Sequence, residues 1–203
     1  MTPAIKTLTD SDAQALIRFA LDAPAGHLPP LHNTRNALLL CLMLDAGLRV
    51  GEACRVHQIQ LHSSAGPLPT LELMPSQTKT RTARSLPLTI RITQLAGILF
   101  AHLWKATPNF ATNYALNLLD PSKPLPVRTA QAIVTRTGER ALGRTIPAHS
   151  LRHTFASRLR RTADLRCVQA LLGHASIRST QIYTHPSADD LAKAIDTLNH
   201  PAP

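Results

Sequence analysis

The segment AHSLRHTFASRL places His149, Arg152 and His153 at the start of a predicted helix. A spacing of three puts His149 and Arg152 on one side of the first turn, where free backbone N–H groups also favour an anion. A phosphate group fits this position, because the planar fork of Arg binds phosphate oxygens bidentately. His and Arg at a helix start are more often solvated, so the motif needs support from the rest of the chain.

A second motif, LLGHASIRSTQIYTH, places His174 directly after Gly173, which ends a predicted helix, and Tyr183 nine residues later. Tyr has a pKa of about 10 and is a weak nucleophile at neutral pH. A Tyr that attacks phosphorus therefore needs cations and proton-transfer groups around it. The alternative is a Tyr that packs its ring and keeps its hydroxyl in water, beside a His that interacts with the helix dipole.

Two further motifs lie upstream. In LDAGLRVGE, Arg49 follows the C-terminal glycine of a buried predicted helix, and Glu52 could orient its side chain. In TKTRTARSLPL, Lys79 lies in a basic turn between two strand-like runs, from which an ammonium could reach a leaving oxygen. Taken alone, Lys79 is an ordinary hairpin lysine.

The ordered series GLRVGE, TKTRTARSLPL, HSLRH and LLGHASIRSTQIYTH resembles the tyrosine recombinase (phage integrase) family over nearly the whole chain. The resemblance implies a site-specific recombinase or integrase of a mobile genetic element, which cleaves and rejoins DNA through a 3'-phosphotyrosine intermediate. It also implies a set of catalytic residues: Arg49 and Arg152 as phosphate-binding arginines, Lys79 as general acid, His149 and His174 as proton-handling or phosphate-binding residues, and Tyr183 as nucleophile.

The charged residues of these motifs favour phosphoryl transfer without a metal ion. Two arginines can neutralise the non-bridging phosphate oxygens, as a divalent metal does in other phosphoryl-transfer sites. The acids are scattered, and neither HSLRH nor LLGH contains one; Cys41, Cys54 and Cys167 show no CxxC spacing. We therefore expect no metal and no cofactor. ATP is not required either, because the phosphotyrosine bond keeps the energy of the broken phosphodiester.

The composition favours a polyanionic partner. The 203 residues include 22 Lys and Arg against 12 Asp and Glu, a net charge of +10, and the window from Arg128 to Arg178 is rich in Arg and has no Lys. An aromatic content of 3% argues against stacking platforms for single-stranded bases. The longest apolar run is far shorter than the roughly 20 residues that span a bilayer, and the N-terminus has no signal-peptide core. We expect a cytoplasmic, DNA-associated protein.

Hydrophobic periodicity and capping signals predict a mainly α fold with one small antiparallel β-sheet (α+β), like a tyrosine recombinase catalytic domain. Thr9 and Asp12 form a predicted capping box; Asn33 is the predicted cap of the second helix and Ser150 that of the helix carrying Arg152. HQIQL, TLELM and SLPL are the predicted strand segments. The predicted helices cover residues 9–22, 33–47, 52–56, 92–103, 128–142, 150–161, 164–172, 176–183 and 188–198.

Residues 1–203 are expected to form a single catalytic domain without the separate N-terminal DNA-clamping domain of most relatives. Gly51 stands where the family often has Ser, and Thr78 and Thr80 flank Lys79 where Gly is common. The expected partners are double-stranded DNA, three further copies in a homotetramer on paired DNA sites, and an accessory DNA-bending protein; no membrane is expected. Three alternatives remain open: a type IB topoisomerase, a catalytically silent DNA-binding regulator, and a zinc enzyme.

Overall fold

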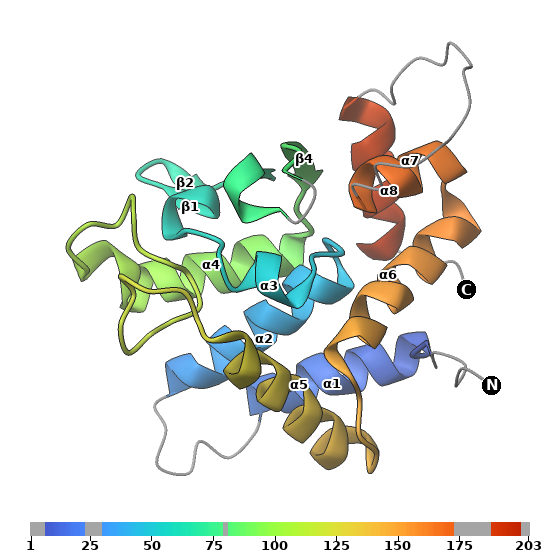
Figure 1. Ribbon diagram of the computed structural model, residues 1–203, viewed down its shortest axis with the longest axis horizontal. Helices are drawn as coiled ribbons and strands as arrows, with labels where there is room; N and C mark the ends of the chain where they lie inside the picture. The colour runs from blue at the N-terminus through green and yellow to red at the C-terminus, as the bar shows by residue number, and fades with distance from the viewer. Residues whose placement is uncertain (1–6, 23–29, 79–80, 173–187, 200–203) are drawn as a thin grey trace.

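The computed structural model describes residues 7–22, 30–78, 81–172 and 188–199 and is mainly helical (Figure 1). Within these residues no helix has the length and apolar character needed to cross a membrane. The α-helices are α1 Asp10–Asp22, α2 Pro30–Leu44, α3 Val50–Ala53, α4 Ile90–His102, α5 Val127–Leu142, α6 Ala148–Thr162, α7 Leu165–Leu172 and α8 Ala188–Asn199.

The strands of the described residues form two separate antiparallel pairs. Strand β1 His62–Ser63 pairs with β2 Gly66–Pro67, and β3 Thr70–Leu73 pairs with β4 Arg84–Pro87. The predicted fold class is therefore confirmed, but the expectation of a single sheet is wrong. HQIQL is not a strand: it contributes the 3-10 helix η1 Gln58–Gln60, because the Gln60 side chain accepts the His57 N–H at 2.8 Å and closes a helical turn. The other 3-10 helices are η2 Pro75–Gln77 and η3 Trp104–Ala106.

Helix α2 forms the centre of the core. Its residues from Ala37 to Leu44 are all buried, because this half of the helix is apolar on every face and the helix contacts α1, α4, α5 and α6. Figure 1 shows α2 between these helices. The predicted cap at Asn33 is wrong: the helix already begins at Pro30, and the Asn33 side chain donates to the carbonyl of Leu21 at 3.2 Å.

The turn after α2 brings α6 close to the first predicted site motif. Gly47 has a φ of +63°, and a Cβ added there would lie 2.3 Å from a ring carbon of Phe155 on α6. Glycine is required twice, once for the left-handed backbone and once for the close approach of the aromatic ring. The turn that leads to Arg49 is thereby held against α6.

Helix α6 begins at Ala148, after Pro147, and not at the predicted cap Ser150, whose hydroxyl instead donates to the carbonyl of Pro147 at 2.7 Å. Proline is well suited to a helix start because its φ is preset and its missing N–H has no partner to lose. His149 therefore lies inside the first turn of the helix.

Ion pairs fasten α1 to the C-terminal half. The predicted capping box is confirmed, with Asp12 N–H donating to Thr9 Oγ1 at 3.1 Å and Thr9 N–H donating to Asp12 Oδ2 at 3.2 Å. Asp10 pairs with Arg158 of α6 at 2.9 Å, and Asp12 pairs with Arg144 at 2.6 Å. These two ion pairs neutralise part of the positive charge of the Arg-rich window within the fold itself.

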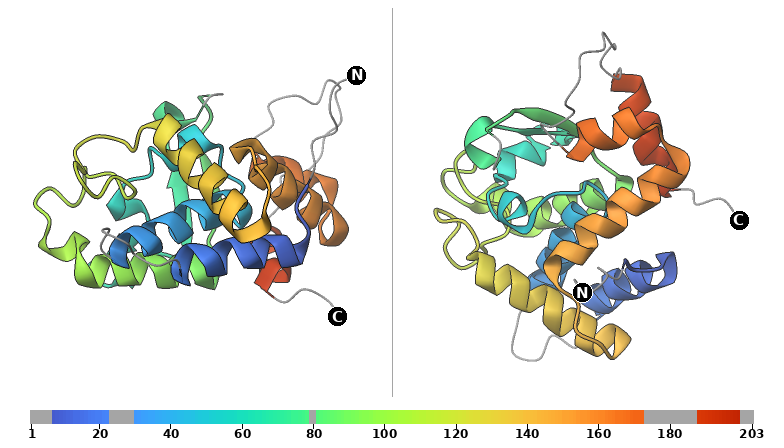
Figure 2. Two further views of the ribbon diagram at one scale, coloured as in Figure 1. Left: turned by 90° about the horizontal axis from the view of Figure 1, so that it is seen from below. Right: turned by 45° about the vertical axis from the view of Figure 1, so that its right-hand side comes forward.

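The last described helix, α8, contacts α6, α7 and β4 (Figure 2). Ala194 and Ile195 are buried in these contacts. The predicted helix at 188–198 is confirmed, whereas the predicted helix at 176–183 lies outside the described residues.

Candidate active site

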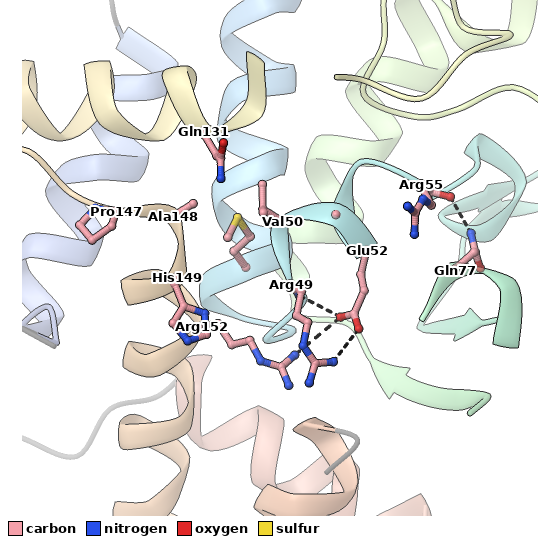
Figure 3. A pocket seen from close by; sticks show the side chains of 12 residues that line it. Arg49, Val50, Glu52, Arg55, Gln77, Gln131, Pro147, Ala148, His149 and Arg152 are labelled. Carbon is pink, nitrogen blue, oxygen red and sulfur yellow. Dashed lines mark hydrogen bonds and ion pairs between the residues drawn. The ribbon is translucent and has the colours of Figure 1, made fainter. Parts of the chain in front are cut away.

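A cavity of about 650 Å³ lies between α3, the N-terminal end of α6 and α5 (Figure 3). Of the predicted site residues, Arg49, His149 and Arg152 line this cavity together, although they come from distant parts of the chain. Lys79, His174 and Tyr183 lie outside the described residues. The polar residues that line the cavity are Arg49, Glu52, Arg55, Gln77, Gln131, His149 and Arg152.

Glu52 organises the cations of the cavity. Its side chain is only 3% exposed, and its Oε1 accepts a hydrogen bond from Arg49 Nη1 at 2.9 Å. Its Oε2 accepts from the backbone N–H of Arg49 at 2.8 Å and from Arg84 Nη2 at 2.6 Å. Arg152 Nη1 lies 3.6 Å from the same oxygen. The carboxylate therefore orients Arg49, as the spacing of the two residues predicted, and also faces two further guanidinium groups.

Arg152 is buried and held by backbone carbonyls. Its Nη1 donates to the carbonyl of Gly47, and its Nη2 donates to the carbonyl of Leu172, at the end of α7, at 2.6 Å. Burial lowers the pKa of Arg152 to about 10, with further lowering by the charges of Arg49 and Arg84 and an opposing contribution from Glu52. The guanidinium stays protonated at neutral pH, so the cavity keeps a fixed cation in a defined orientation.

His149 contributes a different kind of group. It is exposed at the rim of the first turn of α6, and its ring packs edge-on against that of His153 with 4.2 Å between the centroids. Partial desolvation lowers the pKa of His149 below its usual value, and the charges of His153, Arg152 and Arg49 lower it further. The imidazole is therefore neutral at pH 7 and can accept a proton or a hydrogen bond.

Sequence reasoning missed Arg84 and Arg55 as members of this site. Arg84 leaves β4 on the same side as the buried Leu86, and its side chain is 8% exposed. A charged residue at the inward position of a strand requires a partner, and that pattern was the available signal. Arg55 is exposed at the cavity wall just after α3, a position that carries no comparable sequence signal.

The base of the β3–β4 connection is also fixed at the cavity. Gln60 and Gln77 exchange two side-chain hydrogen bonds, at 3.0 and 2.8 Å, and Gln77 also donates to the carbonyl of Arg55 at 2.6 Å. Figure 3 shows Gln77 beside Arg55 at the opposite side of the cavity from His149. The described end of the segment that leads to Lys79 is thus anchored beside the cations.

Taken together, the cavity gathers guanidinium groups around one buried carboxylate, with a neutral imidazole next to them. Such an arrangement suits an anion with several oxygens, because paired guanidiniums bind phosphate through directed hydrogen bonds and stabilise negative charge as it develops.

Three comparisons with known proteins bear on this site. The model of the Phage integrase family matches residues 6–189. The chain is 35% identical over 198 residues to the tyrosine recombinase XerC of Pseudomonas savastanoi pv. phaseolicola, covering 97% of this chain and 60% of that protein. The chain therefore spans less than two thirds of the length of this relative.

Solved structures with a similar fold include the XerA recombinase, at 25% identity and a TM-score of 0.66, covering 97% of this chain and 66% of that one. Another is the XerH site-specific recombinase bound to a palindromic difH substrate in a post-cleavage complex. That match has 23% identity and a TM-score of 0.61, and it covers 84% of this chain and 47% of that one.

Proposed function

This chain belongs to the phage integrase family, and from that membership we propose that it is a site-specific tyrosine recombinase. Its substrate is double-stranded DNA, on which it acts in the cytoplasm. It cleaves and rejoins strands without a metal ion and without ATP. The observation that carries the proposal is the convergence of Arg49, Arg152 and His149 on one cavity, with both arginines beside the buried Glu52.

The described residues are assigned to the scissile phosphate. Arg49 and Arg152 bind its two non-bridging oxygens and neutralise the charge that builds up on them in the pentavalent transition state. His149, which is neutral at pH 7, accepts a proton or donates a hydrogen bond at the same phosphate. Glu52 touches both arginines and is a positioning residue for them.

Lys79, His174 and Tyr183 are assigned from their motifs. The phenolic oxygen of Tyr183 attacks phosphorus and gives its proton to the neutral imidazole of His149. The bond from phosphorus to the 5'-oxygen breaks, and Lys79 gives a proton to that leaving oxygen. His174 assists at the phosphate. The products are a 3'-phosphotyrosine and a free 5'-hydroxyl, and attack of a 5'-hydroxyl from another strand reverses the step. Bond energy is conserved, so rejoining needs no further energy source.

The partners follow from the same chemistry. Strand exchange joins two DNA sites, so we propose that four copies of the chain assemble on a pair of sites, aided by a DNA-bending protein. Residues 1–203 supply the catalytic domain of that assembly. The site-specific recombinase solved with its palindromic difH substrate supports this assignment, because its fold is similar over 84% of this chain.

Covalent capture on fragmented genomic DNA tests the proposal, because such fragments offer the protein every sequence at once. The protein is incubated with the fragments in excess EDTA, denatured, and separated from unlinked DNA; the linked fragments are then sequenced. We expect adducts at recurrent sequences, each with protein on a 3'-phosphate and a 5'-hydroxyl that polynucleotide kinase can label. Failure to form any adduct would contradict the proposal. Adducts at random positions, together with relaxation of a plasmid that lacks a site, would identify a type IB topoisomerase instead.

A further inference from the structure

Arg84 lies behind the active-site carboxylate and does not line the cavity. Its Nη2 donates to Glu52 Oε2 at 2.6 Å, and its Nη1 donates to the carbonyl of Leu171 at 3.2 Å. Arg49 and Arg152 are among the residues that line the cavity and Arg84 is not, so a ligand in the cavity meets the first two but not Arg84. Arg84 therefore acts on a bound anion without touching it, through its charge and through the residues that it contacts.

Glu52 has two opposite consequences for phosphate binding. It orients Arg49 through two hydrogen bonds, one to the backbone N–H and one to the guanidinium. Its negative charge, however, offsets one of the two positive charges that Arg49 and Arg152 present to an anion. A buried carboxylate exerts this effect strongly, because little solvent screens it.

Arg84 supplies the missing positive charge from the buried side. With Arg49 and Arg152 alone, the cluster around Glu52 carries a net charge of +1; with Arg84 it carries +2. The closeness of these groups is reflected in their pKa values: burial lowers the pKa of Arg84, the charge of Arg49 lowers it further, and Glu52 raises it.

We propose that Arg84 is a positioning residue that compensates the charge of Glu52, so that Glu52 can orient Arg49 without weakening the hold of Arg49 and Arg152 on the scissile phosphate. The inference rests on the proposed function. It also explains why a charged residue occupies an inward position of β4, beside the buried Leu86.

The same guanidinium ties β4 to the end of α7. Arg84 and Arg152 donate to the carbonyls of Leu171 and Leu172, which are the last two residues of α7. Carbonyls at a helix C-terminus carry partial negative charge and lack partners within the helix, so two cations stabilise this end. Arg84 therefore has a structural role as well, and a test must separate the two roles.

The experiment that separates the two roles compares three variants by the single-turnover rate of covalent adduct formation at saturating DNA. Each rate is divided by the folded fraction of the variant, which circular dichroism measures. Arg84→Met removes the charge and should slow cleavage by about 10- to 100-fold, within the range for lost electrostatic stabilisation. Arg84→Lys keeps the charge and should recover most of that loss. The double variant Arg84→Met/Glu52→Gln removes both charges, restores the net charge of +2, and should cleave faster than Arg84→Met.

Arg91→Met is the matched control. Arg91 pairs with the buried Asp45 at 2.8 Å, and neither residue lines the cavity, so its loss should lower the melting temperature without slowing cleavage by the folded protein. A double variant that is slower than Arg84→Met, or an Arg84→Lys variant as slow as Arg84→Met, would overturn charge compensation and leave only the structural role.

A second readout does not depend on catalysis. Inorganic phosphate is titrated into the free protein and followed by the arginine Nε–H resonances in NMR spectra. Arg84→Met should weaken phosphate binding, and the double variant should restore it; equal affinity of wild type and Arg84→Met contradicts the inference. A wild-type protein that binds phosphate in this pattern but forms no DNA adduct would contradict the proposed function alone.

Discussion

Arg152 of α6 lies 3.6 Å from the carboxylate of Glu52 of α3, and both side chains line the same cavity. This contact connects the part of the site on α3 with the part on α6. It depends on how closely α6 approaches the turn after α2, where Gly47 lies directly against the ring of Phe155. The geometry of the phosphate-binding arginines thus depends on a contact between Gly47, two residues before Arg49, and Phe155, three residues after Arg152.

Gly47→Ala should destabilise the protein strongly. The new methyl group meets the Phe155 ring, and φ at this position is +63°, so both overpacking and backbone strain oppose the substitution. We expect a loss of about 3 kcal/mol or more in urea unfolding. Gly143→Ala is the matched control, since its φ is +65° but nothing lies within 4 Å of the added carbon. Equal losses in the two variants would show that the Phe155 contact is unimportant.

Arg49→Ala and Arg152→Ala should each slow cleavage by about 100-fold or more, the typical loss for a charge donor in the transition state. Single-turnover adduct formation in excess EDTA measures the effect. Arg160→Ala, an exposed residue of the same helix α6, should cleave at close to the wild-type rate. A strict requirement for a divalent ion in the cleavage step would contradict the assignment of charge neutralisation to the two arginines.

The pKa of His149 in the free protein should lie below the ordinary pKa of a histidine. Its pKa is lowered from 6.5 by desolvation and by neighbouring positive charge, so the folded state favours the neutral ring. Its contribution to stability is therefore complete above about pH 6.5 and is lost as the pH falls through the lowered pKa. NMR titration of the ring Cε1–H, assigned with His149→Gln, measures the midpoint. His153→Phe should move that midpoint upward, whereas a wild-type midpoint at or above 6.5 would contradict this account.

DNA affinity should depend steeply on salt, through a limited set of arginines. Arg49, Arg55 and Arg152 line the cavity, and Arg128 lies one turn before the cavity residue Gln131 on α5. Because Arg49 and Arg152 share the scissile phosphate, these arginines correspond to three phosphate contacts and to a slope of about −2.7 in log K against log salt. A salt series by fluorescence anisotropy measures this slope.

The Arg128→Ala variant should make that slope shallower by about 0.9. Arg144→Ala serves as the control, because Arg144 is already paired with Asp12 at 2.6 Å and should leave the slope unchanged. A nearly flat salt dependence of the wild-type protein, or equal changes in the two variants, would contradict this distribution of contacts.

Local sequence signals predicted much of this fold. The capping box at Thr9 and the burial of the second helix are properties of short segments, and both are confirmed. The start of α6 was misplaced because Ser150 is a good capping residue in general, whereas Pro147 determines the helix start here.

The site was predictable in part. The motifs named Arg49, His149 and Arg152, and the fold brings them together. Arg84 was not predicted as a site residue because its partners, Glu52 and the carbonyl of Leu171, are far away in the sequence. The pairing of a buried Arg with a buried carboxylate is a tertiary relationship, which no spacing within one motif can reveal.

The central claim, that Tyr183 cleaves DNA, is tested most directly by comparing two single-atom variants. The chain has two tyrosines, and Tyr114 stacks on His57 with 4.3 Å between ring centroids, outside the cavity lining. Tyr183→Phe removes only the attacking oxygen, so it should bind DNA with nearly wild-type affinity and form no covalent adduct. Tyr114→Phe should form the adduct normally. A DNA-linked product that persists in Tyr183→Phe on a denaturing gel would show that another residue is the nucleophile.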